Sequence, residues 1–153
     1  MAEKTSESAV RRVYAVVRLK GSVGEKPVIF KTMEKLRLKA VNNCVLVPAT
    51  PSYEGMLKRA SSCITWGPIN SEMLVMLLEK RGVPESGKKL DAKQAKEIAQ
   101  KIMKDGSLEG SGVDSLFRLS PPSKGLKTIK LYYPMGALGF MGDEINGLLE
   151  RMI

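Results

Sequence analysis

The chain has 153 residues, of which 43% are apolar and 27% charged, and its formal net charge is +9 at pH 7. This length suits one compact domain, and the apolar fraction indicates a globular protein rather than a disordered one. The sequence contains no histidine and only two cysteines, so the commonest general base is missing and a four-ligand zinc site is excluded; we expect neither an enzyme nor a cofactor.

No apolar run reaches the roughly 18 residues of a membrane span, and the N-terminus lacks the hydrophobic stretch of a secretory signal. We therefore expect a cytoplasmic protein without a membrane partner. Cys44 and Cys63 lie among β-branched residues, which favours reduced, buried thiols over a disulfide.

The positive charge is concentrated in one part of the chain. Residues 11–62 carry 11 cations against 3 anions, whereas residues 63–153 carry 13 against 11. Such an asymmetry favours one face that binds a polyanion. We expect residues 1–10 to be a flexible N-terminus.

The first predicted elements alternate between strand and helix. The valine-rich segment 12–19 predicts a buried strand. A helix is expected to begin at Pro27, with apolar and basic residues on opposite sides. The apolar stripe consists of Ile29, Met33 and Leu36, opposite Lys31 and Lys35.

A second strand at 43–47 is followed by a helix at 50–60, in which Thr50 can cap and Pro51 can occupy the first position. Segment 63–67 predicts a third strand. Residues 11–68 are thus expected to form a β-α-β-α-β core.

Residues 69–153 are expected to form an extension packed on this core, within a single compact domain. A helix at 70–81 should end before Gly82, and Asp91 with Gln94 resembles a capping box for a helix at 92–103. Residues 105–126 are expected to be mostly loop. A strand at 127–133 and a helix at 143–152 should complete the chain.

Three glycine-containing motifs have alternative interpretations. Gly21 and Gly24 match the GXXG spacing of KH domains but follow a strand, and no Walker loop is present. Residues 136–142 have the wrong spacing for a dinucleotide fingerprint. The loop 118–125 contains Arg118 and Lys124, and no acid occurs between positions 115 and 141; it is either an ordinary surface loop or a polyanion contact.

The spacing of one set of residues resembles a known family. The set comprises Arg18, Gly21, Gly24, Pro27, Thr32, Leu36, Leu38, Asn42, Val45, Val47, Thr50, Pro51 and Gly55-Met56-Leu57. It resembles the large-subunit ribosomal protein family numbered thirty in bacteria and seven in eukaryotes. The segments ITWGP, FRLSPPSKG and GDEINGLLERM are similar to the longer form. The long basic N-terminal arm of eukaryotic members is missing, so the archaeal type fits better.

The resemblance implies an α+β fold with a ferredoxin-like core, a small antiparallel sheet and both core helices on one face. A β-α-β-α-β order by itself would suggest parallel strands. It also implies a structural role in translation as part of the large ribosomal subunit, with large-subunit ribosomal RNA, 5S ribosomal RNA and neighbouring ribosomal proteins as partners. Such a protein would bind phosphates and recognise RNA shape more than sequence.

The predicted RNA-binding residues are Arg18, Lys20, Lys26, Lys31, Lys35, Arg37, Lys39, Lys58, Arg59, Arg118, Lys124 and Lys127. The alternative for each of these residues is a solvated surface cation that contacts no RNA. Trp66 is predicted to be a core or hinge residue rather than a base-stacking platform. The alternative function is a ferredoxin-like regulatory domain that binds a small molecule in a polar cleft.

Overall fold

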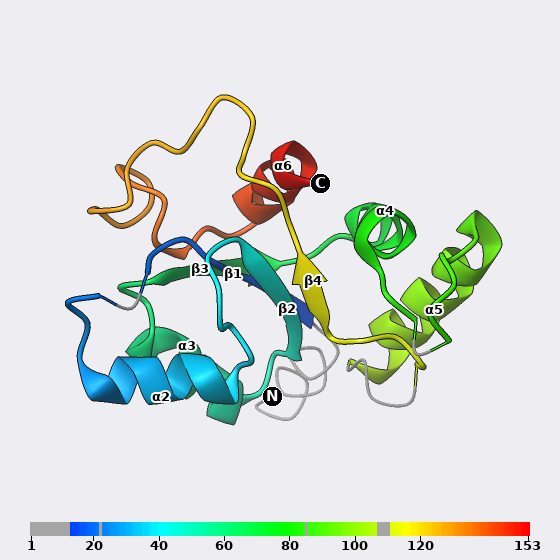
Figure 1. Cartoon of the computed structure of the whole chain (residues 1–153), viewed down its shortest axis with the longest axis horizontal. Helices are drawn as coiled ribbons and strands as arrows, with labels where there is room; N and C mark the ends of the chain where they lie inside the picture. The colour runs from blue at the N-terminus through cyan, green and yellow to red at the C-terminus, as the bar shows by residue number, and fades with distance from the viewer. Residues whose placement is uncertain (1–12, 22, 85, 107–110) are drawn as a thin grey trace, which may run out of the picture.

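The computed structural model describes residues 13–21, 23–84, 86–106 and 111–153; the expected flexible segment 1–10 lies outside them. Figure 1 shows a central sheet with helices on both sides. In chain order the elements are β1 (Val13–Arg18), α2 (Pro27–Lys35), β2 (Asn43–Pro48), α3 (Pro51–Arg59), β3 (Ile64–Pro68), α4 (Ser71–Arg81), α5 (Ala92–Asp105), β4 (Leu116–Arg118), β5 (Gly139–Phe140) and α6 (Glu144–Met152).

The sheet has the order β4-β2-β1-β3-β5. Its central strand β1 is antiparallel to both β2 and β3, and β4 is antiparallel to β2. The ferredoxin-like α+β fold with an antiparallel core is therefore confirmed. The complete sheet is mixed, because the short edge strand β5 runs parallel to β3.

The sheet separates two apolar layers, and the alternation of side chains along β1 supplies both. Val13, Ala15 and Val17 belong to the layer that contains the buried residues of α4, α5 and α6. Val16 belongs to the other layer, against which Tyr14 also packs, together with α2 and α3. This double burial explains why β1 is an almost continuous apolar run.

Figure 1 shows α2 and α3 together on one face of the sheet, and α4 and α6 on the other. α5 packs against α4 rather than on the sheet itself. The expected placement of both core helices on one face is thus confirmed. The extension supplies the cover for the second face.

The predicted caps at the helix starts agree with the structure, and the helix predicted at 92–103 continues to Asp105. The Thr50 side chain accepts a hydrogen bond of 3.4 Å from the Tyr53 N–H and so caps α3. At α5, the Gln94 side chain accepts from the Asp91 N–H at 3.4 Å, as a capping box requires. α5 ends at Gly106, whose φ of 75° is the left-handed conformation that glycine adopts without strain.

The strand predicted at 127–133 is wrong, since this segment consists of bends, turns and one isolated bridge, from Tyr132 to Leu138. The C-terminal strands are instead β4, within the expected loop, and β5, within the glycine motif at 136–142. β4 pairs with β2 and β5 with β3, so the two outer positions of the sheet are already taken. Of the pairing predicted at 127–133, the structure keeps an isolated parallel bridge from Tyr132 to Leu138, next to β5.

Candidate nucleic-acid interface

A row of exposed cations follows the solvent side of α2. Met33 and Leu36 are buried on the inner side of the helix, at 1% and 2% exposure. We call the row and its continuation at the end of α3 the basic band. It comprises Lys26, Lys31, Lys35, Arg37, Lys39, Lys58 and Arg59, all of them exposed.

Contacts between loops bring the two helices of the basic band together. The Ser62 hydroxyl, which follows α3, donates to the Glu25 carboxylate at 3.3 Å, just before α2 begins. The start of α2 therefore lies beside the end of α3, so Lys58 and Arg59 extend the row that begins at Lys26. Lys20 is half-buried and forms an ion pair of 3.6 Å with Glu25, which makes it a less available cation than the others.

Few carboxylates oppose this charge. In residues 11–62 the acids are Glu25, Glu34 and Glu54. Glu25 is engaged by Lys20 and Ser62, and Glu54 accepts a hydrogen bond of 3.3 Å from the Tyr14 hydroxyl. Of these three acids, Glu34 is the one whose side chain is exposed. The basic band therefore keeps a strongly positive field toward solvent.

Arg18 does not belong to the surface, which corrects its predicted role as a phosphate contact. It is only 3% exposed. Its Nε donates to the Lys20 carbonyl at 2.9 Å, and one terminal nitrogen donates to the Leu38 carbonyl at 2.8 Å. Arg18 thus joins the loop after β1 to the loop after α2, and it positions residues of the basic band without facing a ligand.

The far end of the basic band reaches β4. One terminal nitrogen of Arg37 donates to the Ser115 hydroxyl at 3.2 Å. Arg118 is exposed on β4, where it pairs with Asn43 of β2. The structure therefore brings Arg118 toward this end of the band, although it lies about eighty positions away in the sequence.

Lys124 and Lys127 lie elsewhere. Arg151 of α6 donates to the carbonyls of Ser123 and Gly125, at 3.3 and 2.9 Å, and so fixes their loop beside α6. Because α6 covers the sheet face opposite to α2 and α3, these two lysines form a separate surface (Figure 1). The predicted set of cations is thus divided between two sides of the molecule.

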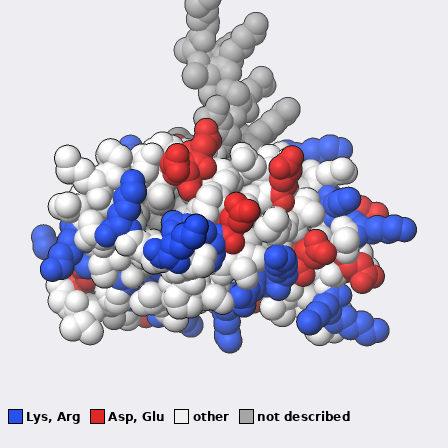
Figure 2. Space-filling view, turned by 90° about the horizontal axis from the view of Figure 1, so that it is seen from above, with Lys and Arg blue, Asp and Glu red and all other residues white. Residues whose placement is uncertain are grey.

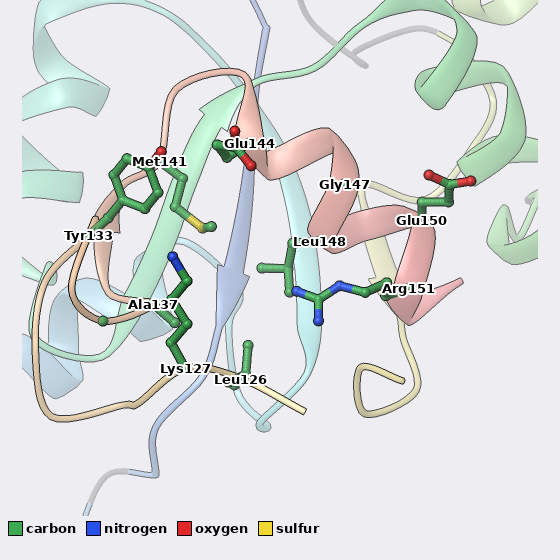
Figure 3. A pocket seen from close by; sticks show the side chains of 11 residues that line it. Leu126, Lys127, Tyr133, Ala137, Met141, Glu144, Gly147, Leu148, Glu150 and Arg151 are labelled. Carbon is green, nitrogen blue, oxygen red and sulfur yellow. The ribbon is translucent and has the colours of Figure 1, made fainter. Parts of the chain in front are cut away.

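An open cavity of about 350 Å³ lies between this loop and α6. In Figure 3, Tyr133 and Met141 line one side and Leu148 and Arg151 the other, with the side chain of Lys127 extending between them. The Lys127 Nζ already donates to the Pro134 carbonyl at 3.3 Å, and Arg151 is engaged as described. Glu144 and Glu150 also line the cavity, so it carries polar as well as apolar groups, and the small-molecule alternative stays a prediction.

Both cysteines are free and buried. Burial raises the pKa of the Cys44 thiol to about 12, and burial also raises the pKa of Cys63. Neither thiol is therefore a ready nucleophile at neutral pH. Within the described ranges no three potential ligand residues gather as a metal site, and no helix in these ranges is long and apolar enough to cross a membrane.

Trp66 is confirmed as a core residue. It is 7% exposed, and its ring lies 6.2 Å from that of Phe140 on the neighbouring strand. Its face is therefore unavailable to a stacked base.

A small α+β domain with an exposed band of cations and no catalytic or metal-binding cluster among its described residues is typical of a nucleic-acid-binding structural protein. The family model of ribosomal protein L30p/L7e matches residues 14–64. The chain is 37% identical over 152 residues to the large ribosomal subunit protein uL30 of Methanosphaera stadtmanae, covering 92% of this chain and all of that protein. It is 39% identical over 151 residues to the uL30 protein of Archaeoglobus fulgidus, covering 92% and 99%.

The chain therefore belongs to the uL30 family of large-ribosomal-subunit proteins, in its archaeal type. This is a family of structural proteins and not of enzymes. The resemblance found in the sequence is thus confirmed.

Proposed function

We propose that this protein is a structural constituent of the large subunit of a cytoplasmic ribosome and that its basic band binds large-subunit ribosomal RNA. The observation that carries the proposal is the band itself: seven exposed cations along α2 and the end of α3, with one exposed carboxylate among the acids of residues 11–62. Neighbouring ribosomal proteins and 5S ribosomal RNA, as further partners, rest on the family relationship.

The geometry of the band suits the backbone of folded RNA. α2 has nine residues, so the helical part alone extends for about 13 Å, and the flanking cations lengthen it. Lys31 and Lys35 project one turn apart on the exposed side. Long, flexible cations in a row contact phosphates of a folded strand and carry no base-specific pattern, so we expect recognition of shape rather than of sequence.

The band also stands on a rigid support. α2 packs against the sheet through buried Met33 and Leu36. Arg18 joins the loop before α2 to the loop after it, because it donates to the carbonyls of Lys20 and Leu38. A preformed row of cations loses less conformational entropy on binding than a disordered basic tail does.

The salt dependence of binding to large-subunit ribosomal RNA tests the proposal. Seven phosphate contacts predict that log K falls with log salt at a slope of roughly −5 to −6, with single-strand and duplex coefficients as bounds. Replacing Lys31 and Lys35 together with glutamine should weaken binding and reduce the magnitude of the slope by about 1 to 2. Neither side chain contributes to the core, so the thermal midpoint of unfolding should not change.

The matched control is the double replacement of Lys93 and Lys96 with glutamine on α5. Both lysines are exposed, and the change in net charge is the same. This control should leave the affinity and the slope nearly unchanged. Equal effects of the two double variants would mean that net charge drives binding, and no effect of the α2 variant would exclude the basic band as the RNA-binding surface.

A further inference from the structure

The loop of residues 124–135 exposes a second surface, in which apolar side chains alternate with lysines. Leu131, Tyr132 and Met135 are 52%, 54% and 79% exposed, and Ile129 is 37% exposed. The exposed cations of the loop are Lys124, Lys127 and Lys130. The sequence contains no acid between positions 115 and 141, although Glu144 and Glu150 of α6 line the cavity into which Lys127 extends.

The loop is held by its own hydrogen bonds, although it is neither helix nor strand. The Gly136 N–H donates to the Tyr132 carbonyl at 2.8 Å, and the Tyr133 N–H donates to the Leu138 carbonyl at 2.9 Å. The Tyr132 ring lies over Gly139, at 3.0 Å from where a Cβ on that glycine would stand. One side of the tyrosine ring thus lies against the backbone at Gly139, while about half of the side chain stays open to solvent.

Figure 2 views the side of the molecule that carries this loop and α6, and it shows Lys and Arg at both ends of this face. Most of the Asp and Glu visible in that view lie nearer the middle and the opposite end. The loop therefore presents exposed apolar area together with exposed lysines.

We propose that the 124–135 loop binds unpaired nucleotides of RNA, with Tyr132 as the stacking platform and Lys127 and Lys130 as phosphate contacts. This inference rests on the proposed RNA-binding function and adds a second mode of recognition to it. Leu131 and Met135, exposed in the same loop, add apolar area for contact with the bases. A ring already fixed against Gly139 loses little side-chain entropy when a base stacks on it.

The chemistry of the loop favours RNA over a protein partner. Its three exposed lysines complement a polyanion, whereas lysine is depleted in the interfaces between proteins. It also favours unpaired over paired nucleotides. In an A-form helix the faces of the bases are covered by their neighbours, so an exposed aromatic ring gains stacking area only where bases are splayed out.

The test uses the full-length protein and two RNA probes. The first is a hairpin whose loop of unpaired nucleotides carries the fluorescent base 2-aminopurine, and the second is a duplex that contains the same stem sequence without the loop. Tyr132→Leu should weaken binding of the hairpin roughly 5- to 150-fold, the range expected for loss of one base–aromatic stack. Tyr132→Phe keeps the ring and should bind like the original protein, with the same quenching of the 2-aminopurine fluorescence.

Phe30→Leu is the matched control. Phe30 is also an exposed aromatic residue, at 41% exposure, but it lies on α2. This variant should leave the quenching of the hairpin loop unchanged. Duplex binding, which depends on phosphate contacts, should be the same for the original protein and for Tyr132→Leu.

Three results would overturn the inference. Tyr132→Leu could bind the hairpin as tightly as the original protein, or it could weaken hairpin and duplex equally, which would deny a preference for unpaired bases. It could also leave both RNA affinities unchanged but reduce association with the large subunit, which would make the loop a contact for a neighbouring protein. The Lys31 and Lys35 double variant in the same assay separates this inference from the proposed function, because it should weaken hairpin and duplex alike.

Discussion

Replacing Arg18 with methionine should destabilise the fold by about 2 to 4 kcal/mol. The guanidinium makes two charge-assisted hydrogen bonds, to the carbonyls of Lys20 and Leu38, and each such bond contributes roughly 1.5 to 3 kcal/mol. The bond to Leu38 is buried, so its carbonyl would lose its partner without access to water, whereas the carbonyl of half-buried Lys20 can be rehydrated. Removing a buried charge recovers part of the loss, which sets the net value below the sum.

Arg118→Met provides the matched control, because it makes the same change on an exposed side chain of β4. Its free energy of unfolding should change by no more than about 0.5 kcal/mol. Urea unfolding of both variants measures the difference, provided that the m-value stays constant. Similar shifts of the two midpoints would refute the structural role of Arg18.

The salt dependence of RNA binding supplies a second readout for the same variant. If Arg18 only holds loops together, the folded Arg18→Met protein keeps the slope of the original. A slope whose magnitude falls by roughly 0.7 to 0.9 would mean that Arg18 neutralises a phosphate after all.

Two further predictions concern the cap of α3 and a buried thiol. Thr50→Ala should lower the stability by about 1 kcal/mol in thermal unfolding, while Ser52→Ala, on the exposed first turn of the same helix, should change it little; equal effects would show that Thr50 does not cap. Cys44 should resist alkylation at pH 8 until the protein unfolds, because its pKa is raised from 9.0 to about 12. Between these two pH values the folded protein keeps the proton of the Cys44 thiol, whereas the unfolded chain releases it. The stability that this thiol contributes is therefore complete below about pH 9 and is lost as the pH rises toward about 12. The loss should be smaller in Cys44→Ala, and rapid alkylation of the native thiol would contradict its burial.

Local patterns in the sequence were enough to predict the helices and the first three strands. Thr50 and Pro51 mark the start of α3, and Gly82 follows the end of α4, through interactions within a few residues of chain. The stripe of Ile29, Met33 and Leu36 likewise predicted which side of α2 faces the sheet, and hence that Lys31 and Lys35 are exposed. These features can be predicted from the sequence because the interactions that cause them lie within a few residues of chain.

The sequence by itself thus determined the family, the order of elements in the core and most of the basic band. Only the tertiary structure decided the roles of Arg18 and of the 127–133 segment. The valine-rich context of Arg18 is the same whether its side chain faces solvent or two backbone carbonyls, and the carbonyl of Leu38 comes from twenty residues along the chain. Segment 127–133 folds into a loop that meets the residue before β5 at the isolated bridge from Tyr132 to Leu138, while β4 and β5 form the edges of the sheet. Pairing and burial depend on which distant segments meet, and a single sequence carries that information only through the whole fold.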